Sequence, residues 1–192
     1  TTTASSYDKV FECLAKMRWQ PALHTISRYS DNPAYIDALV RSAKQSIEAL
    51  DWVPEKILLS YHSIPQSYYD KGDPYACYCK KTSRQFAERA GYNEGTVVTS
   101  FQSRVGFADW VSPYTDKMVE ELAASGIKKL AVMAPAFSAD CLVTLEELNM
   151  ELREQFMSAG GTHFHYIPCL NDTKLGISVL EKVVREEGAA WL

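Results

Sequence analysis

Two patterns of apolar and polar residues alternate along the chain. Apolar runs of strand length fall at residues 21–27, 56–61, 96–100, 129–134 and 163–167. Apolar residues spaced three and four apart predict helices at residues 7–17, 35–50, 76–90, 113–124, 142–159 and 173–187. Because strands alternate with helices, the pattern predicts an α/β fold, in which a parallel sheet is flanked by helices on both faces in a Rossmann-type three-layer arrangement.

The strand predicted at residues 56–61 runs directly into His62, and Ser63 and Pro65 turn the backbone after it. Sites in parallel α/β sheets form at the carboxyl ends of strands, so His62 is the first candidate for chemistry. A lone histidine more often bonds to backbone groups than it acts on a substrate. At a strand terminus, however, a neutral imidazole can accept a proton or bind a metal.

Acidic residues form a second candidate group on the helix predicted at residues 142–159. Val143, Glu147 and Glu151 are four residues apart, so they share one face of an α-helix with a rotation of about 40° per step. Two acids on one face can pass protons or a cation along it. A solvated helix surface explains the same spacing, and spacing alone favours that interpretation.

Aromatic residues crowd the loop that follows the strand predicted at residues 96–100. They are Phe101, Phe107, Trp110 and Tyr114. Flat rings near a site can pack on a flat apolar ligand, although such rings more often bury a loop. His163 and His165 alternate on a predicted strand and face one side, but no matching carboxylate accompanies them, so we expect them to be structural.

Length and charge limit the classes of function. The chain has 192 residues, 46% of them hydrophobic, and a net charge of −4 without a basic block, which argues against a nucleic-acid partner. No apolar run reaches membrane-spanning length, so we expect a soluble cytoplasmic protein, with peripheral contact to a membrane left open. The chain begins TTTASSYDK, with Ser5 or Ser6 as a predicted helix cap, which suggests the C-terminal part of a longer protein.

The five cysteines fit a reducing compartment because they are odd in number and not spaced as a disulfide framework. Only Cys77 and Cys79 are close in sequence. One intervening residue matches the paired ligands of zinc sites poorly. We expect ordinary thiols, with a metal or iron–sulfur role as the alternative.

Four sequence motifs resemble the ferrochelatase family over nearly the whole chain. They are SYHSIP with GDPY, FQSRVGFADWVSPYTD, APAFSADCL with TLEEL, and AGGTHFHYIPCLND. Members of that family are lyases that insert Fe²⁺ into a porphyrin to make haem, and they consist of two similar α/β lobes. The resemblance implies that residues 1–30 are the end of the N-terminal lobe and the crossover. It implies that residues 31–192 are the C-terminal lobe, with a chelatase-like fold whose last helix packs back on the missing N-terminal lobe.

The resemblance also implies roles for individual residues. His62 matches the family's active-site histidine, which takes a pyrrole proton or handles the metal, and Glu147 and Glu151 match a line of acids leading to the porphyrin centre. His62 and Glu147 are then catalytic, and both contact the metal together with Glu151. The implied porphyrin-binding residues are Tyr61, Gln102, Ser103, Arg104 and Trp110. Fe²⁺ and a porphyrin, protoporphyrin IX first, are the implied partners; no cofactor is expected, and a 2Fe–2S cluster is the less favoured alternative.

One position departs from the family pattern D-x-x-E-T-L. Val143 stands where the family has its catalytic glutamate, and valine can neither accept a proton nor stabilise an arriving cation. Three explanations remain: an engineered or erroneous position, a natural enzyme in which Glu147 or His62 suffices, and a paralogue that binds porphyrin without metallating it. The first hypothesis is therefore a ferrochelatase that releases two protons per metal inserted. A non-catalytic porphyrin-binding paralogue is the alternative, and a chelatase for another metal or ring fits the HSIP and GDPY motifs less well.

Overall fold

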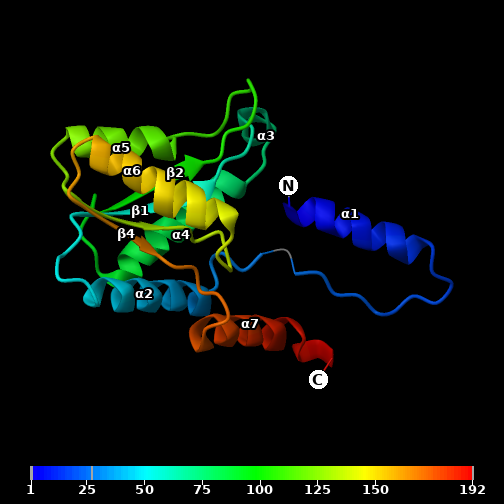
Figure 1. The fold of residues 1–192 in the computed structure, drawn as a ribbon. Coiled ribbons are helices and arrows are strands. Elements are labelled where there is room, and N and C mark those ends of the chain that lie inside the picture. The colour runs from blue at the N-terminus through cyan, green and yellow to red at the C-terminus, as the bar shows by residue number, and fades with distance from the viewer. Residues whose placement is uncertain (1, 27, 192) are drawn as a thin grey trace.

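A computed structural model describes residues 2–26 and 28–191, and within this part four parallel strands form one sheet in the order β2-β1-β3-β4 (Figure 1). The strands are β1 (Lys56–His62), β2 (Val97–Gln102), β3 (Lys129–Met133) and β4 (His163–Ile167). The chain leaves β1 toward β2 on one side and continues from β3 to β4 on the other. The strand order therefore reverses between β1 and β3, where open α/β sheets bind ligands at their carboxyl edge.

Helices cover both faces of the sheet, as the sequence predicts. Ile57, Leu59 and Tyr61 belong to the core under α2 (Pro33–Glu48) and α4 (Tyr75–Ala90), and α7 (Lys174–Glu187) packs on α2. Leu58 belongs to the opposite core, under α5 (Thr115–Ala124), η1 (Val143–Glu151) and α6 (Leu152–Ser158). The alternation along β1 thus decides which helices each side chain meets.

Local sequence signals explain most element boundaries. Asn32 Oδ1 accepts a hydrogen bond from the Ala34 amide at 2.9 Å and caps α2. Gly91 ends α4 in the left-handed region, at a φ of 75°, which glycine adopts without strain. Thr173 accepts from the Gly176 amide at 3.1 Å and caps α7. The predicted strands at residues 56–61, 96–100, 129–134 and 163–167 are confirmed to within two residues.

The N-terminal segment differs from the prediction. α1 (Thr2–Ala15) begins before Ser5 and Ser6, so neither residue is the cap. The strand predicted at residues 21–27 is wrong for residues 21–26, and Ser27 lies outside the described residues. This segment projects from the body together with α1, so it has no neighbouring strand to pair with (Figure 1). Two short helices, α3 (Gln66–Asp70) and η2 (Ala189–Trp191), were not predicted.

A π-helix replaces the first half of the helix predicted at residues 142–159. In η1 the bonding follows the i→i+5 pattern, with the Leu152 amide donating to the Glu147 carbonyl, and α6 continues in the ordinary register. A step of four residues rotates by slightly less than one full turn in a π-helix, whereas the same step rotates by more than one full turn in an α-helix. Val143, Glu147 and Glu151 therefore still neighbour one another, but the sense of the predicted rotation is wrong.

The contacts of the two chain ends lie on one side of the molecule. Tyr7 donates from its hydroxyl to the Ile26 carbonyl, and His24 Nε2 lies 2.9 Å from Glu187 Oε2 on α7.

The lobe boundary at residue 30 stays a prediction. Across the described residues, no helix is both long and apolar enough to cross a membrane.

Candidate active site

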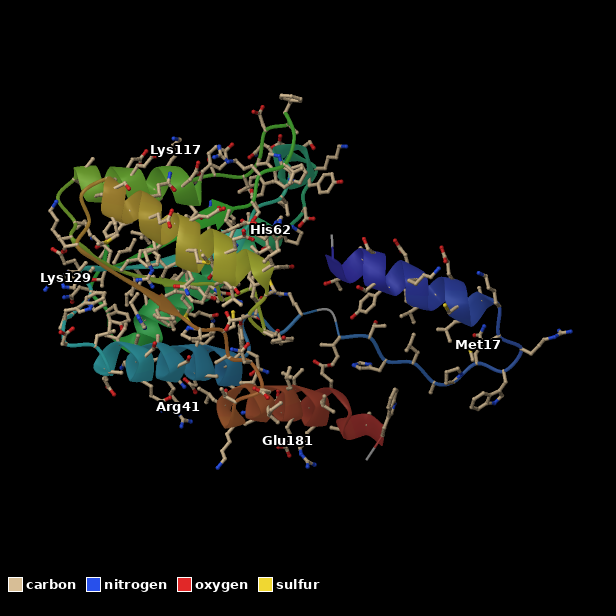
Figure 2. All side chains as sticks on the ribbon, in the orientation of Figure 1. Met17, Arg41, His62, Lys117, Lys129 and Glu181 are labelled. Atoms are coloured by element: carbon tan, nitrogen blue, oxygen red, sulfur yellow. The ribbon has the colours of Figure 1, made fainter. Side chains whose placement is uncertain are left out.

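His62 is the last residue of β1 and lies at the carboxyl edge of the sheet, at the opposite end from Lys129 (Figure 2). Its ring is half-buried, and Nδ1 lies 2.6 Å from the carbonyl oxygen of Ser63. A carbonyl only accepts, so in this bond Nδ1 carries the proton. When the ring is neutral, this tautomer leaves the Nε2 lone pair available, which is what a proton acceptor or metal ligand needs.

The loop after β2 adjoins His62. His62 and Gln102 are Cα partners in the parallel register of β1 and β2. Ser103 follows with a φ of 62°, a region that residues other than glycine rarely adopt and that is enriched at functional sites. Its hydroxyl donates to Glu147 Oε2 at 2.6 Å, which joins this loop to η1.

A pocket of about 240 Å³ lies between β2, α5 and η1, and His62 is not among the residues that line it. Five predicted site residues contribute to its wall: Gln102, Ser103, Arg104, Glu147 and Glu151. Glu147 is half-buried and Glu151 is exposed, so the two acids lead from the site toward solvent. The structure thus brings these five residues together, and His62 adjoins the group through Gln102, its Cα partner on the neighbouring strand.

A buried hydroxyl network lies beneath this pocket. Ser60 donates to Gln102 Oε1, and Thr115 Oγ1 lies 2.8 Å from both Ser60 Oγ and Ser100 Oγ. Gln102 is only 6% exposed, yet its Nε2 has no partner among the described residues. A buried donor without a partner costs about 1–3 kcal/mol, so this amide lowers the stability that the network contributes. No periodicity in the sequence marks Thr115 and Ser60, because their role depends on the contact between α5 and β1.

Tyr61 lies apart from this group. Alternation along β1 turns it to the face opposite His62, where its hydroxyl lies 2.9 Å from Ser83 Oγ. It lines a separate cavity of about 640 Å³ with Tyr29, Tyr35 and residues of α1 and α4. Tyr61, which is predicted to contact a ligand, therefore lies on the opposite face of the sheet from His62.

Trp110 and Arg104 lie in the loop between β2 and α5. Trp110 is half-buried and donates from Nε1 to the Val105 carbonyl at 3.0 Å. Arg104 pairs with Asp116 in the first turn of α5, and its guanidinium carbon lies 4.1 Å from the centre of the Tyr114 ring. Both side chains thus have partners within the chain.

Asp140 anchors the start of η1 and was not among the predicted site residues. It accepts hydrogen bonds from Tyr166 at 2.8 Å, Asn171 at 2.7 Å and Thr144 at 3.0 Å. Burial raises the pKa of this carboxyl, but the hydrogen bonds from Asn171, Tyr166 and Cys169 outweigh it, so the pKa lies below the ordinary value. Val143, the first residue of η1, is half-buried just beyond this anchor.

Candidate metal ligands are spread out. No three His, Cys, Asp or Glu side chains lie close enough to enclose a metal ion in the part of the chain that the structure describes. Cys77 is exposed and Cys79 is buried, so the two thiols of α4 lie on different sides of that helix. His165 bonds to Ser46 Oγ at 2.7 Å, and the His163 ring packs 5.2 Å from Trp52, so both have structural contacts.

Comparisons with known proteins agree with the motifs. The family model described as Ferrochelatase matches residues 1–188. The ferrochelatase of Agrobacterium fabrum is 53% identical over the whole chain, and that of Rhizobium meliloti is 51% identical. The chain spans 56% of the length of each of these relatives.

A solved structure, titled as a cobalamin (vitamin B12) biosynthesis CbiX protein from Marinobacter aquaeolei VT8, aligns with 69% of the chain and 97% of its own length. Its TM-score is 0.45 at 16% identity. The match to the family model over residues 1–188, with the identity of the curated relatives, shows that the chain belongs to the ferrochelatase family.

Proposed function

We propose that the chain supplies the proton acceptor and the metal route of a ferrochelatase, which inserts Fe²⁺ into a porphyrin, protoporphyrin IX, to make haem. The observation that carries this proposal is that strand pairing sets His62 beside Gln102, while Ser103, the next residue, bonds to Glu147. A base with a free lone pair and a carboxylate held beside it suit a reaction that exchanges protons for a cation.

The chemistry requires two protons to leave as one divalent cation enters. Two of the four pyrrole nitrogens of a free porphyrin carry N–H protons, and the metal replaces both. His62 Nε2 accepts the two N–H protons one after the other, and the imidazolium releases each of them to solvent before the next transfer. Glu151 and Glu147 offer negative charge from solvent to the site, so the cation approaches along them.

Ser103 fixes the orientation of Glu147 through its hydrogen bond, while Gln102, Arg104 and Trp110 are proposed to contact the macrocycle. The place of Gln102 in the wall of the pocket beside Glu147 supports this assignment for Gln102.

Further parts of the proposal concern the whole protein. The chain spans 56% of the length of its relatives. We therefore propose that another lobe of the same protein closes the porphyrin cleft over the carboxyl edge of the sheet. A cytoplasmic location, at the inner membrane periphery if the protein contacts lipid, and function without a resident cofactor or iron–sulfur cluster belong to the same proposal.

Val143 supports a second candidate function, a porphyrin-binding protein that does not metallate the ring. An apolar side chain occupies the first residue of η1, half-buried, where the family pattern has an acid. If that acid is indispensable, the remaining residues bind the macrocycle without taking up metal.

An insertion assay separates the two candidates. Protoporphyrin IX and Zn²⁺ are added to the chain, and the assay is repeated with Fe²⁺ in the absence of oxygen. The absorbance shift of the porphyrin reports binding, and the bands of the metalloporphyrin report insertion. Insertion by the chain with Val143 supports the enzyme. Binding without insertion, with insertion gained in Val143→Glu, supports the second candidate. Absence of binding by the chain joined to its other lobe contradicts both.

A further inference from the structure

The connecting segment, residues 16–26, runs from the end of α1 back to the body on the side where α7 and the C-terminus lie (Figure 1). Every residue from 16 to 25 is exposed, and Trp19 and Leu23 keep 78% and 46% of their surface in solvent. Packing therefore holds this segment weakly, and its position depends on a few specific contacts.

His24 makes two such contacts with the C-terminal elements. Its Nε2 lies 2.9 Å from Oε2 of Glu187, the last residue of α7, and its ring lies 6.0 Å from the Trp191 ring of η2 at an angle of 78°. An ionised carboxylate only accepts, so Nε2 carries the proton of this bond and Nδ1 is the nitrogen left to take up a second proton. A neutral imidazole thus already makes the bond, without adding a charge to it.

The end of α7 concentrates negative charge beside His24. Glu186 and Glu187 are adjacent in the last turn, where the helix dipole adds a partial negative charge of its own. A proton on Nδ1 converts the neutral hydrogen bond into an ion pair and gives the ring a cation–π contact with Trp191. Because both gains belong to the charged ring alone, uptake of one proton tightens the contact.

Other charged groups on the neighbouring elements have partners of their own. They pair as Lys182 with Glu186 at 3.7 Å, Arg185 with Glu181 at 2.9 Å, Arg28 with Asp31 at 3.6 Å and Lys9 with Glu12 at 2.8 Å. Asn32 also donates to Glu186 at 2.9 Å, which ties the start of α2 to the same end of α7. Carboxylates stay ionised above about pH 5, whereas a histidine changes its charge between about pH 5 and 8. A proton taken up in that range therefore goes to the imidazole and not to these acids.

We propose that His24 is a proton-sensitive clasp: as an imidazolium it fixes the connecting segment to the end of α7, and as a neutral ring it lets the segment loosen. Since the segment carries α1, the clasp sets how firmly α1 is held to the body. Another lobe that precedes α1 then moves more freely against this body at high pH than at low pH. That last step rests on the proposed function, whereas the clasp itself rests on contacts within the chain.

Fluorine NMR of the full-length protein, in which the chain is joined to its other lobe and carries fluorotryptophan, tests the clasp. Trp191→Phe and Trp19→Phe assign the two signals. From pH 7.5 to 5.5 we expect the Trp191 signal to shift and the Trp19 signal to broaden, because the segment loses motion. The ratio of clasped to open segment should rise about twofold to fivefold, as for an exposed ion pair, and by less at high salt.

Two variants examine the partners of the clasp. His24→Gln keeps a neutral hydrogen bond to Glu187 but cannot take up the proton, so both changes should vanish. Glu187→Gln keeps the titrating ring but removes its counter-charge, so both changes should become smaller. Responses in His24→Gln as large as those in the unmodified protein would overturn the clasp, and so would a Trp191 signal that ignores pH.

His163→Gln is the matched control. The His163 ring lies 5.2 Å from the Trp52 ring, so this variant also removes a histidine next to a tryptophan, but on the body of the molecule. The responses of Trp191 and Trp19 should stay intact in it. Loss of these responses in His163→Gln would assign them to a change of the whole protein and would contradict the clasp.

The outcomes also separate the clasp from the proposed function. Trp191 and Trp19 signals that follow pH through His24, in a protein that inserts no metal, support the clasp and contradict the proposed enzyme. Metal insertion by a protein whose Trp191 signal is unaffected by His24→Gln supports the enzyme and contradicts the clasp.

Discussion

Ser103 donates a hydrogen bond from Oγ to Oε2 of Glu147 across 2.6 Å, and this bond joins the loop after β2 to the π-helix. The φ of 62° at Ser103 is sterically unfavourable for a residue with a side chain, so the surrounding structure must compensate for it. The bond fixes one carboxylate oxygen of Glu147 at the edge where His62 ends β1. We therefore treat Ser103 as a positioning residue.

Ser103→Ala tests this relationship. A hydrogen bond to a charged group is worth about 1.5–3 kcal/mol when buried, and solvent access to both half-buried residues reduces that. We expect Zn²⁺ insertion to slow roughly fivefold, with the free energy of unfolding changed by less than about 0.5 kcal/mol. Ser67→Ala on α3, an exposed serine, is the control. An insertion rate equal to that of the control would remove Ser103 from the account.

Thr115→Val tests the buried hydroxyl network under the pocket. Valine keeps the shape of threonine, but leaves Ser60 and Ser100 without the oxygen that each meets at 2.8 Å. Because both serines are fully buried, we expect the free energy of unfolding to fall by about 1–3 kcal/mol in urea titrations. Thr115→Ser, which keeps the hydroxyl, should lose less. The network has no stabilising role if the serine variant is the less stable of the two.

The stability of the fold is expected to depend on the protonation of His165. Burial lowers the pKa of this imidazole, the Arg153 charge lowers it further, and Ser46 Oγ lies 2.7 Å from its Nε2. The imidazole of His165 therefore binds a proton at higher pH in the unfolded chain than in the folded chain. The contribution of neutral His165 to the free energy of unfolding is complete above about pH 6.5 and declines as the pH falls below that value. Urea unfolding at pH 7.5 and 5.5 should show a smaller decline in His165→Asn than in the unmodified chain. Equal declines would contradict the assignment.

The sequence predicts the positions of His62 and Gln102 well, for a physical reason. Parallel strands end at one edge, so residues that follow two such strands must be neighbours, and the register pairs these two directly. Strand alternation turns Tyr61 away from His62, although both lie in one motif, and the porphyrin contact of Tyr61 stays a prediction.

The π-helix could not be read from residue spacing. Val143, Glu147 and Glu151 are compatible with both α and π hydrogen bonding, because i and i+4 are neighbours in each. The choice depends on tertiary contacts such as the Asp140 anchor and the buried Leu148. The segment 21–26 has a strand-like composition, but a strand also needs a partner, and composition does not report one.

The central claim is that His62 and Glu147 act on the same metal-insertion reaction, and a double-mutant cycle measures it most directly. The rate of Zn²⁺ insertion into protoporphyrin IX is compared for the unmodified chain, His62→Ala, Glu147→Gln and the double variant. His163→Ala, at the start of β4, is the control for loss of a histidine. We predict that each single variant slows insertion by about 10²-fold or more, and that the double variant is little slower than the slower single one. Insertion by His62→Ala at the rate of the His163→Ala control would contradict the account.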